Sequence, residues 1–72
     1  MSLTQMLLDI AERIGRKKYS DGDVIIIRSG SFWKAMFEPV GVQANESDIK
    51  QLTAYPTLGR ALLNLIYDEM EK

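Results

Sequence analysis

Asp23–Glu38 has the sequence DVIIIRSGSFWKAMFE, and it is the only stretch of this 72-residue chain with the pattern of a β-hairpin. The β-branched run Val24 to Ile27 is followed by a Ser29-Gly30 break and then by an aromatic-rich run of similar length. Two such runs joined by a short glycine-containing segment are typical of paired antiparallel strands. Because an isolated hairpin is only marginally stable, the rest of the chain must cover its apolar surface.

Two registers of the hairpin are compatible with the sequence. If Ser29-Gly30 is a two-residue turn, glycine takes positive φ at no steric cost and Ile27 faces Phe32. A three-residue loop over residues 29–31 shifts the pairing by one residue and exchanges the two faces of the first strand. Segregation of charge favours the second register, whereas turn chemistry favours the first. We expect the first register. One face then carries Val24, Ile26, Trp33, Ala35 and Phe37, with Trp33 well buried.

The other face of the hairpin in that register is the candidate interface. It carries Ile25, Ile27, Phe32 and Met36. Aromatic and methionine side chains are enriched at the centres of protein interfaces. Small domains often gain stability by oligomerising, and the two-fold dimer is the commonest arrangement. We therefore expect this surface to contact a second copy of the chain or another protein. A homodimer could form either by packing these surfaces together or by pairing two hairpin edges into a four-stranded sheet. The alternative is that the first and last helices cover opposite faces and leave no surface free.

Helices are expected on both sides of the hairpin. Ser2 is a candidate N-cap for a first helix ending near Gly15, a candidate C-cap. Its apolar residues recur at helical spacing and predict the buried side: Leu3, Met6, Leu7, Ile10 and Ile14.

After the hairpin, Asn45 or Ser47 begins a short helix through about Ala54. A final helix runs from Pro56 or Thr57 through roughly Glu71, with these residues in its apolar row: Leu58, Leu62, Leu65, Ile66 and Met70. The predicted fold is one small α+β domain spanning residues 1–72, in the order helix–strand–strand–helix–helix, with a small antiparallel hairpin sheet packed by helices.

The composition limits the possible chemistry. The chain has no cysteine and no histidine, so it contains neither a disulfide framework nor the usual catalytic relays. Its five glycines lack a phosphate-binding spacing, and its carboxylates are explained by turns and helix ends. We expect no enzyme, no metal, no cofactor and no small-molecule substrate. The longest apolar run, Val24 to Ile27, is far too short for a membrane span, and the N-terminus lacks the features of a signal peptide, so a cytoplasmic location is expected.

A basic set provides the alternative function. It consists of Arg13, Arg16, Lys17 and Lys18, with Arg28 and Lys34 as possible neighbours. Cations with aromatic side chains nearby can hold a phosphate backbone and stack on bases. The net charge of −1 gives no general attraction to nucleic acid, and cations at a helix end are commonly just solvated. The sequence therefore predicts a non-catalytic interaction module, a small homo-oligomeric regulatory or accessory protein, with nucleic-acid binding as the alternative.

Overall fold

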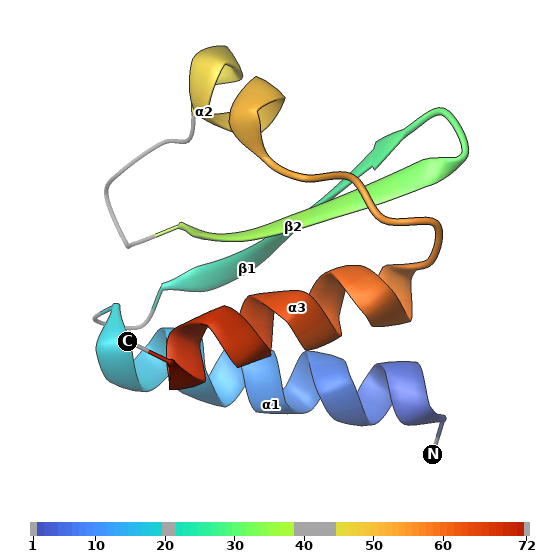
Figure 1. The fold of residues 1–72 in the computed structure, drawn as a ribbon. Coiled ribbons are helices and arrows are strands. Elements are labelled where there is room, and N and C mark those ends of the chain that lie inside the picture. The colour runs from blue at the N-terminus through green and yellow to red at the C-terminus, as the bar shows by residue number, and fades with distance from the viewer. Residues whose placement is uncertain (1, 20–21, 39–44, 72) are drawn as a thin grey trace.

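Three helices and one antiparallel hairpin make up the part of the chain described by the structure, a computed structural model covering residues 2–19, 22–38 and 45–71 (Figure 1). The elements, in order, are α1 (Leu3–Lys18), β1 (Asp23–Ser29), β2 (Phe32–Glu38), α2 (Glu46–Gln51) and α3 (Leu58–Met70). The α+β class and the element order are as predicted.

The helix starts follow from local sequence. The N-caps are Ser2, Asn45 and Thr57, whose side-chain oxygens accept hydrogen bonds of 3.1, 2.9 and 3.1 Å from the backbone N–H three residues later. Each bond satisfies a backbone donor that the helix leaves unpaired. The second helix ends at Gln51, before the predicted Ala54, because the chain becomes extended at Leu52.

The hairpin has neither of the two predicted registers. Ser29 pairs with Phe32, so the loop is Gly30-Ser31, and Gly30 has a φ of 63°. A glycine at the first loop position suits a primed turn, and this placement adds one more pair to the ladder. The observed pairing differs by two residues from the preferred one. Because side chains alternate with a period of two, the predicted membership of the two faces is nevertheless correct.

Both long helices cover the same face of the hairpin (Figure 1). They run side by side in the same direction, with Thr4 next to Gly59 at one end and Lys18 next to Glu69 at the other. The buried cluster between helices and sheet consists of Ala11, Phe37, Leu62 and Ile66. The alternative in which the first and last helices cover opposite faces is therefore wrong.

The predicted buried side of α1 is partly wrong. Leu3, Met6 and Ile10 are exposed. The side that faces the core instead carries Leu7, Leu8, Ala11, Ile14 and Gly15. This side also follows helical spacing, and its two small residues let α1 approach the hairpin closely.

Two further residues differ from expectation. Gly15 is not a C-cap: α1 continues to Lys18, and the cap is Tyr19, whose N–H donates to the Gly15 carbonyl at 3.0 Å. Trp33 lies on the same face as Phe37, as predicted, but near the tip of the hairpin, where it is only half-buried. The Arg28 guanidinium lies 5.4 Å from the centre of its ring, a cation–π contact. Phe37, stacked on Tyr19 at 5.0 Å, is the aromatic anchor of the core.

Candidate interaction site

The largest group of exposed apolar side chains lies on the helices rather than on the hairpin. Six residues, each 41–76 % exposed, form what we call the outer helix surface: Leu3, Met6 and Ile10 of α1, with Leu63, Tyr67 and Met70 of α3. Within each helix these residues are three or four positions apart, so they share one side. Isolated exposed apolar residues are ordinary, but a contiguous group of this kind is typical of a binding surface.

The two rows lie beside the same seam between α1 and α3. A hollow of about 370 Å³ between the N-terminal parts of the helices is lined by Leu3 and Leu7 on one side and by Leu58 and Leu63 on the other. The hairpin covers the opposite side of the helix pair (Figure 1). The outer helix surface is therefore the side of the helix layer that points away from the sheet.

Charged side chains border this surface. Arg60 precedes Leu63 by three residues, and Glu71 follows Tyr67 by four, so these two charges stand at opposite ends of the α3 row. On α1, Asp9 and Arg13 adjoin Met6 and Ile10 around a second hollow of about 300 Å³. Neither Arg60 nor Glu71 makes an ion pair within residues 2–19, 22–38 and 45–71. The rim of the outer helix surface thus carries both signs of charge.

The predicted interface residues do share one face of the hairpin. Ile25 pairs with Met36, and Ile27 and Phe32 point to the same side. Phe32 is 50 % exposed, whereas the other three are half-buried. The short helix α2 lies on this side, where the Lys34 ammonium donates a hydrogen bond of 3.2 Å to the Ile49 carbonyl. This face is consequently a smaller and less open surface than the outer helix surface.

The predicted basic set is not brought together. Arg13, Arg16, Lys17 and Lys18 lie in the C-terminal half of α1, which is followed by the start of β1. Arg28 lies at the other end of β1, by the hairpin tip, and Lys34 projects from the sheet face that α1 does not cover. Two of the cations also form ion pairs: Arg16 with Glu12 at 3.8 Å, and Lys18 with Glu69 at 3.7 Å. No single face collects the six charges.

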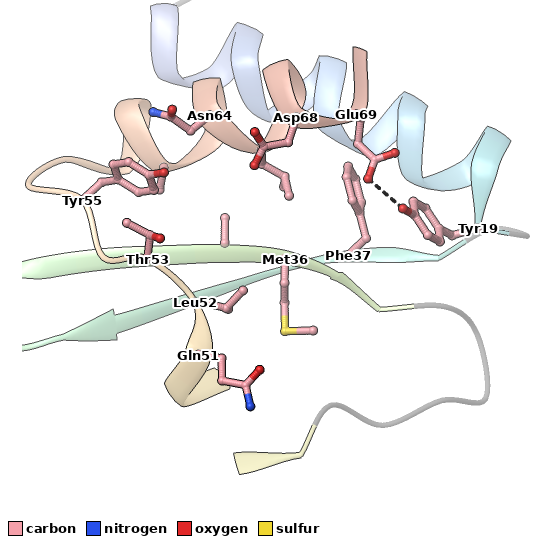
Figure 2. Close-up of a pocket in the computed structure, with 13 residues that line it drawn as sticks. Tyr19, Met36, Phe37, Gln51, Leu52, Thr53, Tyr55, Asn64, Asp68 and Glu69 are labelled. Atoms are coloured by element: carbon pink, nitrogen blue, oxygen red, sulfur yellow. Dashed lines mark hydrogen bonds between the residues drawn. The ribbon is translucent and has the colours of Figure 1, made fainter. Parts of the chain in front are cut away.

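Glu69 is not part of a solvated helix end. Glu69 is only 5 % exposed, and its carboxylate accepts a hydrogen bond of 2.7 Å from the Tyr19 hydroxyl (Figure 2). The Lys18 ammonium also donates to the Glu69 carbonyl at 3.2 Å. These bonds join the last turn of α3 to the end of α1. The sequence holds one indication that Glu69 is buried: it follows Leu62 by seven residues and Ile66 by three, a spacing that puts all three on one side of a helix.

A groove of about 360 Å³ follows the free edge of β2 (Figure 2). Tyr55 stands at one end and Tyr19 at the other, with Asn64 and Asp68 of α3 along one side and Leu52 and Thr53 along the other. Close to the Tyr55 end, the edge of β2 is already paired: Trp33 and Tyr55 exchange two backbone hydrogen bonds of 2.7 and 2.8 Å. No sequence motif indicated this groove, because it is formed by segments that are distant in the chain.

The described residues contain no group of three or more acidic, histidine or cysteine side chains placed to hold a metal ion. None of their helices is both long and apolar enough to span a membrane.

Comparison with models of known protein families, with curated proteins and with solved structures finds no match for this chain.

Proposed function

We propose that this protein is a non-catalytic interaction module that acts as a homodimer, with the outer helix surface as the contact between the two copies. The observation that carries the proposal is the exposure of six large apolar side chains on one side of the α1–α3 pair. Burying them against a second copy removes this apolar area from water, a favourable term of roughly 25 cal/mol per Å² that is opposed by the entropy lost on association. A domain of 72 residues has a small core and benefits from such burial.

The pattern along α3 is self-complementary, which favours a second copy over an unrelated partner. In a two-fold contact, the α3 helices of the two copies pack antiparallel, so that Leu63 of one copy faces Tyr67 of the other. The same arrangement brings Arg60 next to Glu71 of the second copy, twice per dimer. A two-fold interface uses the same surface on both copies, so every contact between two different residues occurs twice, once in each direction. A row with opposite charges at its two ends meets this requirement. Opposite charges at the rim then fix the register of the two helices.

Sedimentation velocity at micromolar protein concentration tests the proposal. The wild-type chain should sediment as a dimer, and Leu63→Glu should raise the dissociation constant by about a hundredfold or more, because it places a charge at the interface centre. Leu63 is exposed in a single copy, so this change should leave the fold intact, as far-ultraviolet circular dichroism will show. Phe32→Glu is the matched control, since Phe32 is similarly exposed but lies on the hairpin. A monomeric wild-type protein at about 100 µM, a concentration at which even weak dimers form, would refute the proposal.

A charge exchange identifies the arrangement of the helices. Arg60→Glu and Glu71→Arg should each weaken the dimer, because each places like charges opposite one another across the contact. The double variant restores opposite charges at both positions and should recover most of the lost affinity. If the loss of dimerisation free energy in the double variant equals the sum of the losses in the two single variants, the antiparallel α3 contact is wrong.

Nucleic-acid binding is the less favoured function. This function needs a continuous basic surface. Arg28 and Lys34, however, lie away from the cations of α1. A mobility-shift assay with single- and double-stranded DNA and RNA at low salt distinguishes the two functions, because binding through phosphates is strongest there.

A further inference from the structure

The edge of β2 that faces away from β1 carries backbone groups to which the described residues make no hydrogen bond beyond Trp33. The N–H and C=O groups of Trp33 point away from β1, because they bond to Tyr55. Backbone groups alternate in direction along a strand, so those of Ala35 and Phe37 point to the same edge. No hydrogen bond to these groups is made within the described residues. An unpaired row of this kind is a template for a further strand.

The groove beside this edge has the size and charge to receive such a strand. Its volume of about 360 Å³ lies within the range of ligand-binding clefts. The described residues that line it include two carboxylates, Asp68 and Glu69, and no lysine or arginine. Glu69 is engaged by Tyr19 and Lys18, but Asp68 is exposed and has no partner within the described residues. An incoming strand with a cation near Asp68 would therefore be electrostatically complementary.

The chain itself shows that this edge accepts an extended segment. Tyr55 and its neighbours cross the edge at Trp33 and make one antiparallel bridge there (Figure 1). Thr53, two residues earlier, already lines the groove rather than pairing with Ala35. Among the described residues, the edge is thus paired at the hairpin tip and unpaired from Ala35 to Phe37.

We propose that the groove along Ala35–Phe37 binds an extended, lysine- or arginine-containing segment of a partner protein, which adds to the hairpin as a third strand. Backbone hydrogen bonds to β2 provide the affinity in this mode of recognition, and side-chain contacts provide the specificity. Asp68 selects the basic side chain. The groove lies on the sheet side of α3, so its occupation is independent of dimer formation through the outer helix surface.

A random heptapeptide display library is the probe. Peptides selected on the wild-type protein should be enriched in lysine and arginine, and on titration they should shift the amide resonances of Ala35 and Phe37. Asp68→Lys should weaken a selected basic peptide by about tenfold to a hundredfold, the loss expected for one charge-assisted hydrogen bond. The same change should improve the binding of the peptide in which glutamate replaces the basic residue.

A second variant tests the backbone contact. Ala35→Pro removes the N–H that points into the groove and spares the ladder to β1, since proline is tolerated at such edge positions. It should abolish binding of basic and acidic peptides alike, while the hairpin resonances of β1 remain. Asp68→Lys should leave the sedimentation coefficient unchanged, because Asp68 lies outside the proposed dimer contact. The peptide-binding proposal and the dimer proposal can therefore fail independently. Selection that yields no binder, binders without basic residues, or shifts that map elsewhere would overturn the proposal.

Discussion

Gly15 determines how closely α1 can approach the hairpin. A Cβ atom added at this position would lie 2.8 Å from the Gly22 carbonyl oxygen and 3.3 Å from the Phe37 ring. The first of these neighbours is backbone, so it cannot be moved by a change of rotamer. A glycine inside a helix costs about 1 kcal/mol relative to alanine, and the close packing against Phe37 offsets this cost.

Gly15→Ala should therefore destabilise the protein, although alanine is the better helix former. We expect a net loss of about 1–3 kcal/mol in the free energy of unfolding, the usual cost of overpacking. Gly59→Ala is the matched control: its added Cβ would lie 3.5 Å from the Thr4 hydroxyl, an ordinary contact, so it should stabilise by up to about 1 kcal/mol. Urea denaturation measures both. A Gly15→Ala midpoint above that of the wild type would show that the helix and the hairpin are not in close contact.

Residue size explains why the buried side of α1 was partly mispredicted. Selecting large apolar residues at helical spacing gives Leu3, Met6 and Ile10, which are exposed. The buried residues Ala11 and Gly15 carry little apolar area and so contribute little to such a pattern. The α1 helix has more large apolar residues than one buried side can hold. Those left on the solvent side are a sequence signal of an interaction surface.

The hairpin illustrates which properties of an element the sequence determines. Strand positions and the residues of each face were predictable, because they depend on β-branched runs and on a period of two. The register was not, because the preferred and observed pairings differ by two residues and therefore bury the same side chains. Only the turn distinguishes them. Ser29-Gly30 and Gly30-Ser31 are both acceptable primed turns, so local sequence leaves the choice open.

Two measurements test the turn and the register. The added Cβ of Gly30→Ala meets nothing within 4 Å, so its cost arises from the backbone alone. At a φ of 63° we expect a loss of about 1–2 kcal/mol in the free energy of unfolding. Ser29→Ala, next to it in the strand and exposed, should change stability by less than about 0.5 kcal/mol. Strong Hα–Hα nuclear Overhauser effects are expected for Ile26 with Ala35 and for Val24 with Phe37; contacts of Ile27 with Phe32 instead would support the other register.

At the scale of the whole molecule, the arrangement of layers decides which surfaces remain free. The sequence predicted that helices pack on the hairpin, but not that both long helices cover the same face. That choice depends on how Ala11, Leu62 and Phe37 fit together, which no local pattern expresses. As a result the helix layer has an uncovered outer side, while the short α2 lies on the second face of the sheet. The candidate site is therefore a consequence of packing, and the sequence revealed only its apolar residues.

The free energy of unfolding should then depend on protein concentration. A domain of this size has on the order of 5 kcal/mol of stability, so burial of the outer helix surface is a large fraction of it. If unfolding is coupled to dissociation, mass action lowers the midpoint on dilution. We expect the thermal midpoint to fall by about 3–5 °C for each tenfold dilution between micromolar and millimolar protein. Leu63→Glu should abolish this dependence, whereas Phe32→Glu should retain it. An unfolding midpoint that is the same at every concentration would mean that the single chain supplies all of its own stability, and the outer helix surface would then be free for a different partner.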